Sequence, residues 1–467
     1  MLRLLLLGLS TLLPTLALAD FEGTPIGKVR VGAAAVELHA TDDMVVAGTT
    51  HPRKLSGQDG MLRAVATVIQ GPPRDTRVAI VALDIIAIGR KHLDAAAKQI
   101  EQKTGIPFDH ILINCTHTHQ VPSTIRIFDY DAVPEFVAQV ESAIVESVVQ
   151  ANSRLKSAPP TRMLFMMGHE NTVGDNSRIE MRDGTIGYPP FPIEEQLRPT
   201  GPVDPDFPVM VFKRPDRSLA AVIFGHSTHN VGTPHFDRRS PDIYGLAAQA
   251  FEQDTGVVTT FIEGAAGSTI PFEMDGVWPR DVATGVQLGV EAERHILDAI
   301  RYHVDQAPEM AVVRIGSIKR EISVSVRDFD EKREEQAAIA ASKRTISDAP
   351  GEKGAAMFRQ MRAELAPHRG EKRKTWLSVT RIGDVAIVGV PAELFAQLGM
   401  DIKRRSPFRY TIIAELANDW VGYVGNADAY RLGGYQVQMG LHSWTERGTG
   451  ELFVNESVKL LEELYAQ

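Results

Sequence analysis

Apolar residues in the first quarter of the chain fall into short runs, with one amphipathic segment between them. Residues 29–37 (VRVGAAAVE) and 62–71 (LRAVATVIQG) have the composition of strands, and residues 78–88 are almost continuously apolar, as in a strand buried on both faces. Residues 91–103 (KHLDAAAKQIEQK) have helical spacing and are followed by a glycine stop and a new strand from Ile111. This strand, helix, strand unit predicts a right-handed parallel crossover.

The rest of the chain is predicted to continue as a mixture of strands and helices. A strand pair is expected in VMVFKRPDRSLAAVIFGHSTH, with PDRS as its turn, whereas residues 162–208 are expected to be mostly loop. Further strands are expected in TWLSVTRIGDVAIVGVPAE, in TIIAELANDWVGYVG and over 257–262 and 312–326, and further helices over 133–155, 282–306 and 451–465. Residues 328–373 are strongly charged, with a break at 348–353, and are interpreted as a solvated helical insertion.

The first twenty residues (MLRLLLLGLSTLLPTLALAD) have the pattern of a secretory signal peptide. Arg3 precedes an apolar stretch that ends in the small-x-small sequence Ala17-Leu18-Ala19, which predicts cleavage before Asp20. An uncleaved anchor is the alternative, but the stretch is short for a membrane span and contains a proline. We therefore expect residues 1–19 to be removed and the protein to be periplasmic or secreted.

Charge and cysteine content narrow the class of protein. The chain of 467 residues has a formal net charge of −9 at pH 7, which argues against nucleic acid as a partner. Its single cysteine, Cys115, leaves no internal disulfide. The length is ample for a large core, and with no internal repeat or disordered linker we predict a single domain over residues 20–467.

The most informative stretch is residues 111–122 (ILINCTHTHQVP), an apolar run that ends in two histidines one residue apart. In a regular strand, His117 and His119 would lie on one face, roughly 7 Å apart. This spacing suits two metal ligands, or one ligand beside a catalytic partner. Polar residues at a strand end with no partner remain an equally simple interpretation of the pair alone.

Three further strand ends carry residues of the ligand type. They are His226 and His229 after the second strand of the predicted pair, Glu393 after VAIVGVPA, and Tyr423 after TIIAELANDWVG. Imidazoles and a carboxylate suit zinc with one position left open. A phenol is a less usual ligand because it must lose a proton, with an ordinary pKa of about 10, although a dication favours that loss.

Segments along almost the whole chain together resemble the neutral ceramidase family. CTHTHQVP is similar to the zinc-site strand end of that family, and the other matching segments follow in the same order over residues 31–451: VGAAAVELHA, VALDIIAIG, NSRIEMRDGT, FGHSTH with SPDIYG, FIEGAAGSTIP, VGVPAEL and NDWVGYVGNADAY. The resemblance implies an α/β fold with two β-sheets layered between helices, a four-layer αββα arrangement.

The resemblance also implies roles for individual residues. It implies one catalytic zinc bound by His117, His229, Glu393 and Tyr423, with His226 as the alternative to His229. It places three residues at the reacting centre: His119 beside the metal, Arg178 as the arginine of the NSR segment, and Tyr435 as an oxyanion donor. Ser268, two residues before Ile270, is kept as a candidate nucleophile because it is adjacent to the position of the family serine.

Two departures from the family bear on the reaction and the substrate. Ile270 stands where neutral ceramidases have a serine, so zinc-activated water is the simpler nucleophile. The sequence ends at Gln467, soon after the last matching segment, so we expect it to lack the immunoglobulin-like domain of the family and to act on a substrate other than ceramide itself.

The predicted function is that of a secreted zinc hydrolase that cleaves an acyl bond, in first place a linear amide in a small or lipid-like substrate. An esterase or lactonase with the same zinc site is the first alternative. A homologue that binds a ligand without catalysis is the second.

Overall fold

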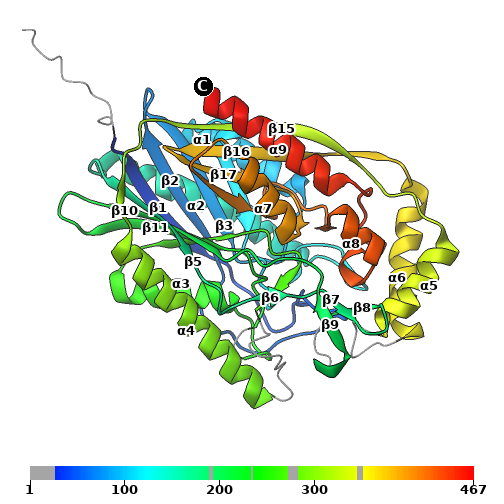
Figure 1. Ribbon diagram of the computed structural model, residues 1–467. Coiled ribbons are helices and arrows are strands. Elements are labelled where there is room, and N and C mark those ends of the chain that lie inside the picture. Colours follow the sequence, from blue (N-terminus) through cyan, green and yellow to red (C-terminus); the bar gives the residue numbers. More distant parts are fainter. Residues whose placement is uncertain (1–26, 189–192, 233–234, 272–281, 344–350) are drawn as a thin grey trace, which may run out of the picture.

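The computed structural model describes residues 27–188, 193–232, 235–271, 282–343 and 351–467 (Figure 1). The predicted signal peptide, residues 1–19, lies outside the described residues. None of the described helices is long and apolar enough to span a membrane.

The first sheet contains the strand that leads to the histidine pair. Its strands, in order, are β1 (Arg30–Glu37), β2 (Arg63–Gly71), β3 (Thr76–Leu83) and β4 (Ile111–Cys115). β1, β2 and β3 pair antiparallel, whereas β3 and β4 are parallel and α1 (Arg90–Thr104) connects them. The predicted strand, helix, strand unit is confirmed. α1 and α2 (Pro134–Arg154) pack with this sheet in one apolar cluster.

The second sheet contains the strand that leads to His229. Its order is β12 (Thr259–Glu263), β11 (Leu219–His226), β10 (Asp206–Lys213), β5 (Arg162–His169) and β14 (Glu309–Met310). α3 (Asp242–Thr255) and α4 (Val282–Gln306) lie side by side beneath it in Figure 1 and share its apolar cluster. The antiparallel pair β10 and β11 is confirmed.

The expectation of a loop over residues 162–208 is wrong at its start, because β5 occupies residues 162–169 and pairs with β10 along its whole length. The segment reads RMLFMMGH. It contains no β-branched residue and only one aromatic residue, so its strand propensity is weak, and its conformation depends on the pairing with β10 and β14.

The third sheet contains the strands that precede Glu393 and Tyr423. Its order is β15 (Ile315–Ser325), β16 (Lys372–Ile382), β17 (Val385–Gly389) and β19 (Tyr410–Ala414). The outer apolar cluster of this sheet includes residues of α7 (Ala396–Arg405) and α9 (Thr449–Ala466). β17 and β19 are parallel and α7 lies between them in the chain.

A shared core joins the three sheets. One cluster of buried side chains includes Ile80 of β3, Phe212 of β10 and Ile387 of β17, so the inner faces of the sheets pack against one another while helices cover the outer faces. The predicted mixed α/β class with helices outside several sheets is confirmed. The stricter four-layer αββα arrangement stays a prediction.

Short elements fill the connections. They are β6 (Asp175–Asn176), β7 (Ile179–Met181), β8 (Ile186–Gly187), β9 (Gln196–Pro199), β13 (Thr269–Ile270), β18 (Glu393–Leu394), β20 (Tyr423–Val424), α8 (Ala427–Leu432) and the 3₁₀ turns Phe108–His110, Leu155–Ser157, Ile193–Glu195, Ala366–His368 and Tyr435–Val437.

The predicted helices within residues 328–373 are confirmed, but the expectation that the segment is solvated is wrong for one face of it. α5 (Glu331–Ser342) and α6 (Glu352–Leu365) form a helical pair at one side of the molecule (Figure 1). α6 buries Met357, Phe358 and Met361 in the same cluster as α1 and α2. Arg362 is fully buried and binds Glu331 on α5 through two hydrogen bonds from Nε and one from Nη2. The charged residues therefore include a buried arginine paired with a half-exposed glutamate, as well as a solvated face.

Removal of the Phe358 ring should test this packing. Phe358→Ala deletes a fully buried ring, so we expect the free energy of unfolding, measured by chemical denaturation, to fall by about 3–5 kcal/mol. Gln360→Ala alters an exposed residue of the same helix and should change it by less than about 0.5 kcal/mol. Similar small effects for both variants would contradict the burial of α6.

Candidate metal and active site

The histidine pair lies in a turn beyond the end of β4. β4 ends at Cys115, and His117 has a positive φ of +58°, a conformation that is uncommon for residues other than glycine. The ring centroids of His117 and His119 are 4.8 Å apart with their planes at 89°. The expected spacing of a regular strand is therefore wrong, because the chain has already turned at His117.

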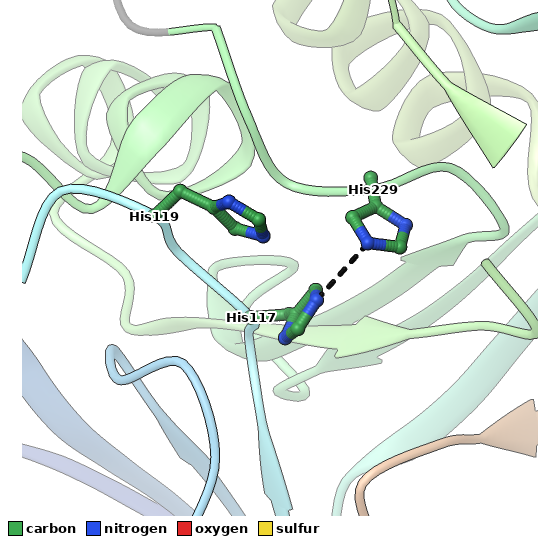
Figure 2. A group of neighbouring side chains, drawn as sticks. All are labelled: His117, His119 and His229. Carbon is green, nitrogen blue, oxygen red and sulfur yellow. Dashed lines mark hydrogen bonds between the residues drawn. The ribbon is translucent and has the colours of Figure 1, made fainter. Parts of the chain in front are cut away.

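The third histidine comes from the second sheet. His229 follows the end of β11 by three residues, and its Nε2 lies 3.1 Å from Nε2 of His117 (Figure 2). Figure 2 shows His117 and His119 on one segment and His229 on another, with the three rings turned toward a common centre. One nitrogen from each histidine can be chosen so that all three lie within 4.8 Å of one another.

Glu393 and Tyr423 reach the same centre as neighbours in a short parallel pair. They are partners in the register of β18 and β20. Glu393 Oε2 lies 3.4 Å from Nε2 of His117 and 3.7 Å from Nε2 of His229. The Tyr423 hydroxyl lies 3.1 Å from Nε2 of His229. The structure thus brings together all four residues that were predicted to bind zinc.

Backbone carbonyls determine which ring nitrogen of His117 and of His229 carries the proton. Nδ1 of His117 lies 2.8 Å from the carbonyl oxygen of Ile86, and Nδ1 of His229 lies 2.7 Å from that of Ala266. A carbonyl only accepts, so each neutral ring carries its proton on Nδ1 and directs a lone pair from Nε2. Two lone pairs then face each other across 3.1 Å, beside a carboxylate oxygen.

This donor set fits a divalent cation. Nitrogen lone pairs and a carboxylate at this separation repel one another, and a cation between them would turn that repulsion into coordination. Donation of the second ring nitrogen to a backbone carbonyl is the usual arrangement of a histidine that binds a metal. The group His117, His119 and His229 can therefore hold a metal ion.

Burial and neighbouring charges shift the pKa values at this centre. Burial and the adjacent His117 lower the pKa of His229 to about 4. Burial opposes ionisation of Glu393, but the attraction of His117 and His229 in their protonated forms and the hydrogen bond from Trp420 outweigh it and lower its pKa to about 2. Burial and Glu393 hold the pKa of Tyr423 well above its ordinary value. Near neutral pH the imidazole of His229 and the carboxylate are ready to bind a metal, whereas the phenol needs the cation to lose its proton.

His119 is held beside the group by its surroundings. Nδ1 of the ring lies 3.0 Å from the carbonyl oxygen of Gly48, and the backbone N–H of His119 donates to the Asp242 carboxylate at 2.8 Å. Nε2 of His119 is buried and has no hydrogen-bond partner among the described residues. Burial and the neighbouring imidazoles keep the pKa of His119 well below its ordinary value, so the ring is a neutral base near pH 7.

A narrow cavity of about 30 Å³ opens onto the group. It is lined by Gly48, Ile86, Ala87, His117, His119, Ile125, Ile127, Phe128, Tyr130, Glu393, Trp420, Tyr423 and Tyr435. The predicted oxyanion donor Tyr435 is therefore at the cavity, with its ring centroid 5.8 Å from that of Tyr423.

Two predicted catalytic residues, Arg178 and Ser268, lie outside the residues that line this cavity and instead line a neighbouring one together. The guanidinium of Arg178 donates to Gln436 and to the carbonyl oxygens of Ala429 and Gly433. The Ser268 hydroxyl accepts the N–H of Ala396. Both side chains therefore contact the segments next to Tyr435 and Glu393.

His226 and Ile270, which were also considered in the sequence analysis, lie outside the histidine cavity. Both ring nitrogens of His226 have partners elsewhere, the Tyr244 hydroxyl at 2.7 Å and the Glu170 carbonyl oxygen at 3.1 Å. His229, not His226, is thus the histidine at the centre. Ile270 is buried, pairs with Asp175 between β13 and β6, and does not line the histidine cavity.

Several residues of the cavity were not predicted from the sequence. Trp420 donates its Nε1–H to Glu393 Oε1 at 3.1 Å and so holds the carboxylate. The apolar lining comes from Ile125, Ile127 and Phe128. Trp420 lies within the NDWVGY segment that was already singled out, whereas the apolar residues carry no signal that separates them from an ordinary core.

Comparison with known proteins agrees with the motifs. No protein-family profile matches the sequence. The neutral ceramidase of Pseudomonas aeruginosa is 23% identical over an alignment of 498 positions, gaps included, that covers 93% of this chain and 72% of that protein. The crystal structure of neutral ceramidase from Pseudomonas aeruginosa matches with a TM-score of 0.70 and 19% identity, over 93% of this chain and 75% of that one. A structure described as ceramidase complexed with C2 matches with a TM-score of 0.71 and 18% identity, over 94% and 75%. The predicted resemblance to neutral ceramidases and the corresponding fold are confirmed.

Gly48 allows the close approach of His119, and its substitution should test this. A Cβ at Gly48 would lie 2.5 Å from Cβ of His119. We expect Gly48→Ala to lower the free energy of unfolding by about 1–3 kcal/mol more than a matched variant, through overpacking. Gly57→Ala is that control, because Gly57 also has a positive φ, of +76°, but a Cβ there meets nothing within 4 Å. Equal losses in chemical denaturation would show that the contact with His119 is not tight.

Proposed function

We propose that this protein is an exported zinc-dependent hydrolase that cleaves a linear amide bond of an N-acyl compound. The observation that carries the proposal is the pair of Nε2 lone pairs of His117 and His229, which face each other across 3.1 Å beside Glu393. The likeness to the neutral ceramidase of Pseudomonas aeruginosa supports the amide as the bond that is cleaved.

Four residues are proposed to hold the metal, namely His117, His229, Glu393 and Tyr423. Nitrogen and carboxylate oxygen ligands suit zinc, with a further position for water or substrate. When bound, zinc lowers the pKa of a coordinated water and polarises an acyl carbonyl. Trp420 assists by holding Glu393 through its indole N–H.

His119 is proposed to move the proton. Hydrolysis joins the water oxygen to the acyl carbon, breaks the C–N bond and delivers a proton to the departing amine. The unpartnered Nε2 of neutral His119 accepts the proton from water and then donates it to the amine. The Tyr435 hydroxyl, also at the cavity, donates to the developing oxyanion.

Arg178 and Ser268 are proposed to act on the positions of other residues. Arg178 binds Gln436, which follows Tyr435, and Ser268 accepts the N–H of Ala396, three residues beyond Glu393. In this proposal water, not Ser268, is the nucleophile, and the single hydrolase domain comprises residues 20–467 after loss of the signal peptide.

Removal of the metal tests the proposed reaction. Purified protein should contain about one zinc per chain and should release the amine and fatty acid from an N-acyl substrate. Dialysis against a chelator should abolish the release, and added zinc should restore it. Full activity in metal-free protein would contradict the proposal. A matched ester panel identifies an esterase if the esters alone are cleaved.

Two histidine variants should separate ligand from proton carrier. We expect His117→Ala to lose bound zinc and activity together. His119→Ala should keep zinc, measured by atomic emission, and lose about a hundredfold or more in kcat. His226→Gln serves as a control, because His226 is buried outside the group and should leave zinc content unchanged. Loss of zinc from His119→Ala would instead assign His119 as a ligand.

A further inference from the structure

The His119 imidazole has few contacts of its own that set its position. Nδ1 of the neutral ring donates to the carbonyl oxygen of Gly48, so the lone pair of Nε2 is directed toward His117 and His229 (Figure 2). Nε2 itself has no hydrogen-bond partner among the described residues. A ring with a single hydrogen bond keeps its place only if the backbone that carries it is held, and two charged side chains hold that backbone.

Arg53 holds the carbonyl end of His119. It lies in the loop between β1 and β2, and its Nη2 donates to the carbonyl oxygen of His119 at 2.9 Å and to Oε1 of Gln120 at 3.0 Å. Gly48, which accepts from the ring, belongs to the same loop. The planar guanidinium presents its donors in a fixed geometry, which the single flexible ammonium of a lysine does not. One loop thus binds both the ring and the carbonyl of His119.

Asp242 holds the amide end of His119. It is the first residue of α3, and its Oδ2 accepts the backbone N–H of His119 at 2.8 Å and the hydroxyl of Thr118 at 2.7 Å. Asp242 is fully buried and has a positive φ of +54°. Such a conformation is unfavourable for a residue with a side chain and persists where the surrounding contacts determine it, which is common at functional sites. The strained start of α3 therefore serves to bring this carboxylate to the histidine turn.

Arg53 and Asp242 carry opposite charges and act on one residue. Burial lowers the pKa of Arg53 and the Asp242 carboxylate opposes this effect, so the two charges interact. Hydrogen bonds from or to a charged group are roughly twice as strong as those between neutral groups. Both peptide groups of His119 are restrained in this way, and neither charged side chain lines the histidine cavity.

We infer that Arg53 and Asp242 are positioning residues that hold the backbone of His119 and so keep its Nε2 directed at the reacting centre. The inference rests on the proposed function, in which His119 moves the proton. Loss of Arg53 should slow the chemical step and leave zinc bound, because the proposed ligands are held by other contacts, namely two backbone carbonyls and the indole of Trp420.

A double-mutant cycle on the zinc-loaded full-length protein tests the inference. Arg53→Met should lower kcat for an N-acyl substrate by about tenfold or more, with KM and zinc content unchanged, because a displacement of about 1 Å is enough for such a loss. In the His119→Ala background the same substitution should change kcat by less than about twofold, since Arg53 acts through the missing imidazole. Arg53→Lys keeps the charge and a donor and should recover part of the loss.

Arg238→Met is the matched control. Arg238 precedes α3 and pairs with Asp59 of the same loop at 3.2 Å, so its removal takes an arginine from this region without loss of a contact to His119. It should leave kcat unchanged. Equal losses from Arg53→Met in both backgrounds would overturn the inference, as would loss of zinc together with activity.

The carboxylate is tested by two substitutions of Asp242. Asp242→Asn keeps an accepting oxygen, and asparagine tolerates a positive φ, so this variant should retain more of kcat than Asp242→Ala. Equal kcat in the two variants at equal zinc content would contradict the role of Asp242. If Asp242→Ala does not fold, the cycle at Arg53 decides the inference.

The imidazole itself provides a measurement that does not need activity. If no amide is cleaved, the proposed function fails, and NMR spectra of protein with isotope-labelled histidines decide the inference. The ring resonances of His119, assigned by their absence in His119→Ala, should report a proton on Nδ1. Arg53→Met should shift or broaden these resonances and leave those of the buried His226 in place. Unchanged His119 resonances in Arg53→Met would overturn the inference.

Discussion

Two imidazoles that direct lone pairs at each other are the interaction on which the candidate site depends. The arrangement is unfavourable by itself, and hydrogen bonds to the backbone maintain it. His117 donates its Nδ1–H to the carbonyl of Ile86 in the loop after β3, and His229 donates its Nδ1–H to the carbonyl of Ala266 in the loop after β12. A ring flip that relieved the repulsion would leave a buried carbonyl unpaired, at a cost of about 1–3 kcal/mol. The fold therefore holds the two nitrogens in a position that a cation stabilises.

The three sheets supply these positions because their strand ends are joined by backbone hydrogen bonds. The N–H of Cys115 at the end of β4 donates to Leu416, and the N–H of Glu415 donates to the carbonyl of Glu263 at the end of β12. The buried Glu415 carboxylate also accepts the N–H groups of Ala266 and Leu394, at 3.0 and 2.8 Å. The Glu415 side chain thus positions both Ala266, whose carbonyl orients His229, and the short strand that contains Glu393. Residues from distant parts of the chain converge because they follow strands that meet at one edge.

Much of this could be predicted from the sequence, for a physical reason. The buried strands are short apolar runs that the pattern predicts. His117 follows the end of β4 by two residues, whereas Glu393 and Tyr423 come four and nine residues after β17 and β19, in the short strands β18 and β20. β5 was missed because its residues have weak strand propensity and its conformation depends on pairing with β10. The turn at His117 was missed for a similar reason, since a positive φ outside glycine is set by the surrounding contacts.

The charged segment 328–373 forms helices as predicted, but it differs from the prediction in that one face of α6 is buried. Charge density predicts solvation, but Arg362 is paired within the segment and Arg126 pairs with Glu364, so apolar residues of α6 can be buried beneath ionic contacts. The ring of Phe358 then contacts the ring of His442, which is stacked on that of Tyr435. A sequence pattern assigns such a segment to the surface because it does not show which charged residues pair with one another. In the folded chain the buried face of α6 is connected to the cavity through the rings of His442 and Tyr435, although no residue of α6 is a proposed ligand.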